Sequence, residues 1–290
     1  MFAVPLRRAL YVPNFGTFAE PSFVADLAAE AERAGWDGFF MWDQLLFEVD
    51  VPISDSWMTL AAVATATQRI QLGPLVTPLP RRRPWKVARE AVTLDRLSAG
   101  RLVLGVGLGG DWYRELSAFG ESDDLWLLAE RLDEGLQLIV SLWSGEVVRH
   151  EGRHYRAIDV RFVPRPMQSP RIPIWVAAVW PNRKPLRRAA RWDGVCPIRA
   201  DQTPLDPTEV EAIAEFLRAE RGSLAGFDVV VQGSTLGLDE AGTRRLLEQY
   251  GAAGATWWLE SLRWDISAQE ARAVVRRGLP AITTECEADG

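Results

Sequence analysis

Residues 94–110, LDRLSAGRLVLGVGLGG, contain the end of a helix, a turn, a buried strand and a glycine-rich exit from that strand. The sequence SAG at 98–100 predicts the helix stop, because glycine adopts the left-handed conformation at little cost. Asp95 and Arg96 are expected to face solvent at the helix end. The apolar run at 102–106 is typical of a parallel strand buried on both faces. The following glycines place bare backbone at the carboxyl end of this strand, where we expect the functional site.

The alternation of strand and helix extends from this stretch along the whole chain. Apolar runs predict strands at 9–13, 38–42, 70–77, 102–106, 172–179, 194–197, 227–231 and 255–259. Helical spacing and capping residues predict helices at 21–34, 55–67, 84–97, 123–142, 185–191, 207–221, 240–250 and 267–277. A turn-rich segment at 146–166 predicts a β-hairpin inserted before the fifth strand. This pattern favours one α/β domain over residues 1–290, a (β/α)8 TIM barrel, with an open doubly wound sheet as the alternative.

The composition narrows the function classes. The chain has 290 residues, of which 48% are hydrophobic, and a net charge of −6, which disfavours nucleic acid as a main partner. No apolar run approaches the roughly 18 residues of a membrane span. Residues 1–16 lack the features of a signal peptide, and Cys196 and Cys286, the two cysteines, are expected to be reduced thiols. We therefore expect a cytoplasmic protein with no membrane partner.

The glycines after the fourth predicted strand admit three interpretations. Gly105-x-Gly107-x-x-Gly110 matches the dinucleotide-binding fingerprint, although a lone match is a weak signal. It lies in the fourth βα unit rather than the first, and the aromatic pair Trp112-Tyr113 follows it. A flat aromatic ligand at the mouth of the barrel is therefore favoured over glycines needed only for tight strand packing, and both are favoured over a Rossmann site.

Titratable residues restrict the chemistry. His150 and His154 are the only histidines and fall in the predicted hairpin, too far apart along a strand to chelate, so we expect no metal site. Ser-His-Asp and Cys-His catalysis are excluded because no histidine lies at a predicted strand end. The carboxylates expected near the mouth are Asp43, Asp111, Glu115 and Glu260. Asp43 is expected to act as an acid or base, as a helix cap or as an ion-pair partner.

Two loops at the carboxyl ends of strands carry possible anion ligands. Residues 178–183 precede a helix whose free N–H groups favour an anion, and Asn182 and Arg183 add a donor and a charge. The alternative is that Asn182 only caps the helix and Arg183 is solvated. The triplet Arg81-Arg82-Arg83 is expected to be a solvated basic loop, with guidance of an acidic ligand tail as the less favoured interpretation.

The tryptophans are a further feature of the strand ends. Trp42, Trp112, Trp180, Trp257 and Trp258 lie at or near predicted strand ends. Most are expected in the core. Two or three around one mouth would form an apolar pocket for a planar ring.

Taken together, these motifs resemble the luciferase-like monooxygenase family of flavin- or deazaflavin-dependent oxidoreductases. The run 83–107 resembles the family pattern of proline, a helix ending in Leu-Asp, Ser-x-Gly-Arg and a Leu-Gly-x-Gly strand. Further elements typical of the family are AERAGWDG at 31–38, Phe119-Gly120, and AARWDG at 189–194. The resemblance implies a TIM barrel with an insertion before strand five.

The resemblance also implies residues that contact the cofactor. A non-proline cis peptide is expected at Leu75-Val76, behind the flavin ring. The segment Gly107, Leu108 and Gly109 is expected to line the ring and ribityl chain. The loop containing Ala178, Val179, Asn182 and Arg183 corresponds to the family's phosphate-binding loop. Asn14, at the end of the first strand, is added as a cofactor contact because of its position.

One departure concerns the end of the second strand. Many family members carry a histidine there after an acidic residue, where it takes part in proton transfer. This chain has Asp43-Gln44, and an amide cannot titrate near neutral pH. We assign Asp43 and Gln44 as the catalytic pair, with water as another carrier of protons.

The resemblance implies an enzyme that uses reduced FMN and O2 on a small organic substrate. A separate flavin reductase and a second copy of the chain in a homodimer are the expected partners. The alternatives are hydride transfer with the deazaflavin coenzyme F420, and a flavin-binding barrel that is not catalytic.

Overall fold

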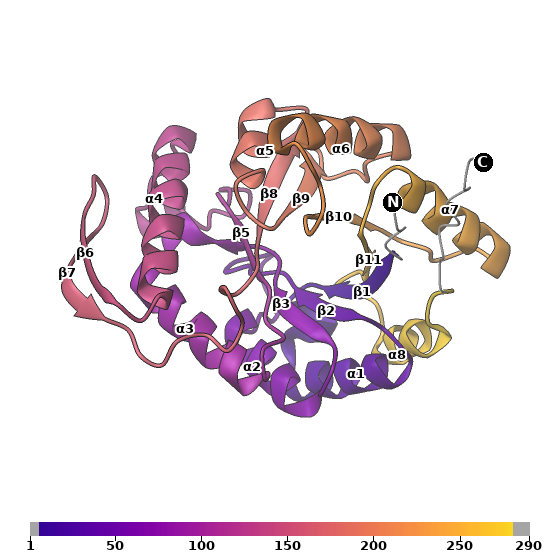
Figure 1. Ribbon diagram of the computed structural model, residues 1–290. Coiled ribbons are helices and arrows are strands. Elements are labelled where there is room, and N and C mark those ends of the chain that lie inside the picture. Colours follow the sequence, from indigo (N-terminus) through magenta and orange to yellow (C-terminus); the bar gives the residue numbers. More distant parts are fainter. Residues whose placement is uncertain (1–5, 281–290) are drawn as a thin grey trace.

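The computed structural model describes residues 6–280, in which nine strands form one parallel sheet around a central axis (Figure 1). The order of the strands in the sheet is β3-β2-β1-β11-β10-β9-β8-β5-β4. Their bounds are β1 (Arg7–Val12), β2 (Gly38–Met41), β3 (Gln71–Pro74), β4 (Thr77–Pro78), β5 (Leu104–Gly107), β8 (Ile174–Trp180), β9 (Gly194–Arg199), β10 (Asp228–Gly233) and β11 (Trp257–Ser261).

The ring closes through the third predicted strand, which the structure divides into β3 and β4. β3 pairs with β2, whereas β4 pairs with β5 on the other side. The Val103 N–H also donates to the Leu72 carbonyl at 2.9 Å, which joins β3 to the residues just before β5. The fold is therefore a TIM barrel, and the open sheet and the Rossmann interpretation are both wrong.

Helices cover the outside of the sheet (Figure 1). They are α1 (Pro21–Arg33), α2 (Ser56–Ala66), α3 (Pro84–Leu97), α4 (Leu125–Trp143), α5 (Arg183–Ala189), α6 (Pro207–Arg221), α7 (Glu240–Ala252) and α8 (Ala268–Arg277). Three short 3-10 helices lie in loops: η1 (Gly16–Ala19), η2 (Leu79–Arg81) and η3 (Ser117–Phe119). α5 begins two residues before the predicted position. α6 and α8 each begin with a capping box. In a capping box the N-cap side chain accepts the backbone N–H of the third helical residue, whose side chain in turn accepts the N-cap backbone N–H.

The predicted insertion is a two-stranded antiparallel hairpin of β6 (Val147–Glu151) and β7 (Arg156–Arg161). It projects beyond α4, at the left edge of Figure 1. Glu134 of α4 holds its turn: the carboxylate accepts the backbone N–H groups of His154 at 2.9 Å and Tyr155 at 2.8 Å, and it contacts His150 Nε2 at 3.0 Å. The hairpin is thus tied to the barrel through α4.

The inside of the barrel is filled by aromatic side chains. The Phe40 and Trp175 rings lie 5.1 Å apart between centroids, and Trp175 and Trp257 lie 5.5 Å apart. Cys196 belongs to this interior cluster and is a free, buried cysteine, whereas Cys286 lies outside the described residues. Trp257 and Trp258 are buried in the core, as expected for most of the tryptophans. Among residues 6–280, no helix is long and apolar enough to cross a membrane.

The end of α3 corrects one expectation. Asp95 is fully buried, because its carboxylate accepts the Met167 N–H at 2.7 Å, the Gln168 N–H at 3.3 Å and the Gln168 side-chain amide at 2.7 Å. The prediction that Asp95 faces solvent is therefore wrong, while its neighbour Arg96 is exposed. The helix stop is confirmed, since Gly100 has a φ of +83°.

Candidate active site

A cavity of about 410 Å3 opens at the carboxyl ends of the barrel strands. Five of the residues predicted to be catalytic or to contact the cofactor line it: Asp43, Gln44, Leu75, Val76 and Gly109. The Leu75-Val76 peptide bond is cis, as expected from the resemblance. The Tyr11 hydroxyl donates to the Leu75 carbonyl at 2.5 Å, which fixes the backbone at this point of the wall.

The glycines of β5 allow the strand to lie against this wall. A Cβ atom at Gly107 would lie 2.8 Å from Val76 Cγ2, and one at Gly105 would lie 2.4 Å from the Pro74 carbonyl oxygen. Gly109, with a φ of +77°, and Gly110 both line the cavity. Tight strand packing therefore explains Gly105 and Gly107, whereas the last two glycines present backbone to the cavity.

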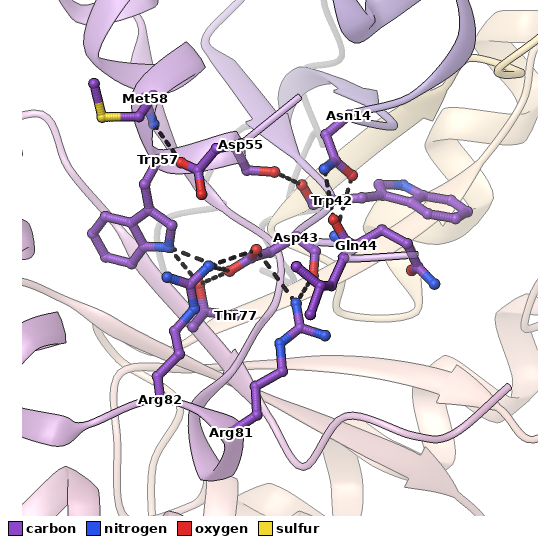
Figure 2. A network of polar contacts seen from close by, with 12 residues as sticks. Asn14, Trp42, Asp43, Gln44, Asp55, Trp57, Met58, Thr77, Arg81 and Arg82 are labelled. Carbon is purple, nitrogen blue, oxygen red and sulfur yellow. Dashed lines mark hydrogen bonds and ion pairs between the residues drawn. The ribbon is translucent and has the colours of Figure 1, made fainter. Parts of the chain in front are cut away.

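Asn14 lies behind the cavity rather than in its wall. Its side-chain amide donates to the Gln44 carbonyl at 2.8 Å and to the Ser54 carbonyl at 2.7 Å, and its oxygen accepts the Gln44 N–H at 3.1 Å (Figure 2). Every polar atom of this buried side chain is thus engaged by backbone. The geometry gives Asn14 a positioning role for the loop that carries Gln44.

The remaining predicted cofactor residues also lie outside the cavity wall: Gly107, Leu108, Ala178, Val179, Asn182 and Arg183. Asn182 is the N-cap residue of α5 and Arg183 is exposed, as the alternative interpretation expected, although the Asn182 side chain makes no capping hydrogen bond. Arg183 stacks over the rings of Trp180 and Phe216, at 5.1 and 4.6 Å from their centroids. Ala177, the residue before Ala178, does line the cavity, and it lies within β8 as Ala178 and Val179 do.

Asp43 is the centre of a buried polar network (Figure 2). Its carboxylate accepts Arg82 Nη2 at 2.8 and 2.9 Å, the Thr77 hydroxyl at 2.8 Å and the Trp57 indole N–H at 3.3 Å. Arg81 approaches from the same side and donates to the Asp43 carbonyl at 2.6 Å. Of the three roles expected for Asp43, the structure shows the ion-pair partner.

A second carboxylate completes this network. Glu115 pairs with Arg81 Nη1 at 3.0 Å and accepts the backbone N–H groups of Leu45 and Leu46. The Arg81 side chain is only 8% exposed, so the expected solvated basic loop is wrong for Arg81 and for Arg82, although Arg83 is exposed. A lone carboxylate would cost much more to bury than this paired set does.

The other two candidate carboxylates do not line the cavity. Asp111 accepts the N–H groups of Leu116 and Ser117 in its own loop. Glu260 is fully buried and accepts the Trp258 indole N–H at 3.0 Å and the Thr235 N–H at 2.7 Å. Burial raises the pKa of Glu260, and these hydrogen bonds oppose that rise. Both are therefore structural.

Two donors in the cavity wall have no partner. Gln44 Nε2 and Trp42 Nε1 are buried and make no hydrogen bond to any described residue. Figure 2 shows the Gln44 amide turned away from the Asp43 network. Buried donors are nearly always paired in folded proteins, so these two atoms fit the oxygen or nitrogen acceptors of a bound ligand.

Aromatic residues form one side of the cavity, and the sequence did not single out Phe15, Phe47 or Trp264 among them. The Phe15 and Phe47 rings stack at 4.0 Å, and Phe47 also contacts the rings of Tyr113 at 4.7 Å and Trp264 at 5.5 Å. A cavity that is apolar with a few convergent donors suits a planar heteroaromatic ring. Trp42 and Trp112 line it too, as the excess of tryptophan near strand ends predicted.

The described part of the chain holds no cluster of three or more side chains able to bind a metal ion. His154 Nε2 contacts Glu130 at 3.1 Å, and His150 contacts Glu134, so each histidine serves the hairpin. The described residues that line the cavity include no histidine and a single thiol, that of Cys196, whose pKa is raised by burial.

Comparison with known proteins gives relatives of two kinds. The chain is 37% identical over 175 residues to an F420-dependent glucose-6-phosphate dehydrogenase of Nakamurella multipartita, covering 56% of this chain and 48% of that protein. It is 33% identical over 157 residues to the oxygenase component of a flavin-dependent trigonelline monooxygenase of Acinetobacter baylyi, covering 54% and 43%. The chain spans about half the length of these curated relatives.

Solved structures agree on the fold. An F420-dependent secondary alcohol dehydrogenase superposes with a TM-score of 0.79 at 14% identity, covering 95% of this chain and 98% of that one. The family described as luciferase-like monooxygenase matches residues 9–272. Because this match spans most of its length, the chain belongs to the luciferase-like monooxygenase family.

Proposed function

We propose that the chain is an oxidoreductase that binds reduced FMN in the mouth cavity and uses O2 to oxygenate a small organic substrate. The observation that supports this most is the pair of buried, unpartnered donors, Gln44 Nε2 and Trp42 Nε1, in a cavity whose wall is rich in aromatic side chains. A flavin ring carries acceptors along one edge and is apolar on both faces. When bound, the reduced flavin would supply the electrons that activate O2.

The residues of this chain would divide the binding between them. Gln44 and Trp42 would donate to the ring, and the Leu75-Val76 backbone, held by Tyr11, would lie behind it. The phosphate of the cofactor would be bound by the loop that contains Ala178, Val179, Asn182 and Arg183. The ribityl chain would lie against the segment with Gly107 and Leu108. The stacked pair Phe15 and Phe47 would exclude water from the ring.

The side chains that could carry protons in the cavity bear on the choice between oxygenation and hydride transfer. Both oxygens of Asp43 accept hydrogen bonds from Arg82, Thr77 or Trp57, so this carboxylate is poorly placed to take a proton from a substrate. Burial raises the pKa of the Tyr11 hydroxyl and of the Cys196 thiol, and both therefore keep their protons. An alcohol oxidation needs a base at the reacting hydroxyl. Asp43 and Glu115 are held by arginines, which leaves Glu48 as the lining carboxylate available for that role.

Hydride transfer with coenzyme F420 is the second candidate. It is favoured by the curated relatives, of which the one at 37% identity is an F420-dependent dehydrogenase. Reduction of a substrate by the reduced deazaflavin needs no strong base and is compatible with Gln44. A flavin-binding barrel that is not catalytic is the third candidate and rests on Gln44 alone.

The test is a titration of the purified chain with FMN and, separately, with F420, using tryptophan fluorescence and oxygen consumption. Saturable FMN binding, with O2 uptake after a separate reductase is added, would support the oxygenase. The trigonelline oxygenase component suggests such a reductase partner. Selective binding of F420 would replace the first candidate by the second. Gln44→His tests the third candidate, because activity that appears only in this variant would mean a barrel that has lost catalysis.

A further inference from the structure

A second cavity, of about 370 Å3, lies beside the mouth cavity and is lined by cationic side chains. It lies between the segment after β4, the first half of α4 and the turn of the hairpin. We name it the arginine pocket, lined by Pro80, Arg81, Arg82, Arg83, Glu121, Arg131, Arg153, His154 and Tyr155. It is separated from the mouth cavity by the ion pairs of Asp43 and Glu115.

The arginine pocket carries more positive than negative charge. Arg81 and Arg82 are paired with acids on the mouth side, and Arg153 is paired with Glu130. Arg131 reaches Glu121 at 3.5 Å, with both side chains partly exposed. Arg83 makes no ion pair with any described residue and lies 5.9 Å from the ring centroid of Trp85. One guanidinium in the lining therefore has no acidic partner.

A buried hydroxyl in the same lining also lacks a partner. Tyr155 is 6% exposed, and its hydroxyl makes no hydrogen bond to any described residue. An unpaired buried hydroxyl costs free energy that a bound acceptor would recover. This observation is independent of the charge count and also indicates an acceptor ligand.

The wall of the arginine pocket is preorganised by two carboxylates of α4. Glu134 accepts the backbone N–H of Tyr155 at 2.8 Å, and Glu130 contacts His154 Nε2 at 3.1 Å. The hairpin turn is therefore fixed against α4 before any ligand arrives. A prepositioned cationic wall loses little conformational entropy on binding an anion.

We propose that the arginine pocket is an oxyanion-binding site that takes a phosphate or carboxylate group through Arg83, Arg131 and the Tyr155 hydroxyl. Guanidinium groups match the geometry of both anions. The proposal does not rest on the proposed function, because the pocket is separate from the mouth cavity and its chemistry requires no ring cofactor.

Calorimetric titration of the full chain with inorganic phosphate and, separately, with glutarate at low ionic strength tests the proposal. Saturable one-site binding of either anion is expected, and the tighter of the two identifies a phosphorylated or a carboxylate ligand. Arg83→Gln is expected to weaken binding about tenfold, since it removes a charge-assisted hydrogen bond. Tyr155→Phe is expected to weaken it severalfold without lowering the Tm of the free chain, because the deleted hydroxyl has no partner there.

Two further variants serve as controls. Arg149→Gln removes an exposed arginine of the same hairpin that pairs with Glu151 and Asp159 outside the pocket, and it should leave affinity unchanged. Arg183→Gln removes the arginine at the start of α5, and it distinguishes anion binding in the arginine pocket from anion binding at the proposed phosphate loop after β8. The proposal is overturned if neither anion binds saturably, if Arg83→Gln behaves like Arg149→Gln, or if Arg183→Gln abolishes binding that Arg83→Gln retains.

Discussion

Replacing Asp43 by alanine should destabilise the folded chain even when no ligand is present. The Asp43 side chain is 4% exposed, and its removal leaves Arg82 without an ion-pair partner, whereas Arg81 keeps Glu115. Breaking a buried pair on one side costs about 3–5 kcal/mol. Because the Arg82 side chain is 22% exposed and partly hydrated, we expect about 2–4 kcal/mol.

The cost can be measured as a shift in Tm. An unfolding entropy of about 2.1 cal/mol/K per residue gives about 0.6 kcal/mol/K for this chain, so Asp43→Ala should lower Tm by about 3–7 °C. The control is Asp265→Ala, which breaks an exposed pair with Arg263 and should change Tm by less than about 1 °C. The double variant Asp43→Ala/Arg82→Met should recover part of the loss, because it removes the orphaned charge. A Tm unchanged by Asp43→Ala would refute the view that this network is a buried, coupled unit.

Three more predictions concern other positions. Gly105→Ala should destabilise the folded chain by several kcal/mol, because the new Cβ would lie 2.4 Å from the Pro74 carbonyl oxygen. Gly110→Ala should be tolerated, because its nearest contact would be at 3.4 Å, and the Tm values of the two variants test this difference. Asp95→Ala should cost about 2–4 kcal/mol and speed proteolysis of the segment after the hairpin, because it removes three hydrogen bonds. The pKa of the Glu260 carboxyl is raised in the folded chain, so the folded chain binds this proton more tightly than the unfolded chain does. The free energy of unfolding should therefore fall as the pH rises from the unfolded pKa through the folded pKa. Urea titrations at several pH values should show that Glu260→Gln flattens this dependence of stability on pH.

Each of these three has an outcome that contradicts it. Equal Tm values for Gly105→Ala and Gly110→Ala would show that the strand can move away from the wall. Unchanged proteolysis in Asp95→Ala would show that other contacts hold the segment. A pH profile that Glu260→Gln leaves unaltered would assign the slope to other carboxylates.

The barrel could be predicted because the sequence signals for its strands and helices lie within or next to each element. Apolar runs of strand length, glycines at turns and polar residues before helices each act within a few positions, so nearly every element appeared where expected. The division of the third strand at Leu75 and Val76 had no local signal in the periodicity. The periodicity predicted one strand at 70–77, whereas the structure has the separate strands β3 and β4. The family resemblance supplied the cis peptide at Leu75-Val76 but not this division.

The partners of charged residues could not be predicted in this way. Asp95 was expected in solvent because it ends an amphipathic helix, yet its partners Met167 and Gln168 lie more than 70 residues later. Arg82 finds Asp43 across 39 residues in the same manner. A charged residue in a loop is predicted to be solvated unless its ion-pair partner is known. That partner is distant in the sequence and is identified only once the fold is known.

The part of the aromatic wall that Phe47 and Trp264 contribute was not predicted, for a related reason. Phe47 and Trp264 lie in loops after different strands, and only the closed barrel brings their rings within 5.5 Å. Tyr11 was assigned to the first strand with no role, although its alternation with inward residues was available as a signal. Loop residues converge through topology rather than through spacing.

Binding of a ring cofactor in the mouth cavity is tested most directly by titrating FMN and F420 into the wild-type chain and into Ala177→Phe. Ala177 lies within β8 and lines the cavity, so a phenylalanine there would occupy the space meant for the ring. We predict saturable quenching of tryptophan fluorescence by at least one cofactor in the wild type and its loss in Ala177→Phe, with folding confirmed by circular dichroism. Binding of neither cofactor to the wild type, or equal binding to both proteins, would contradict a ring site in this cavity.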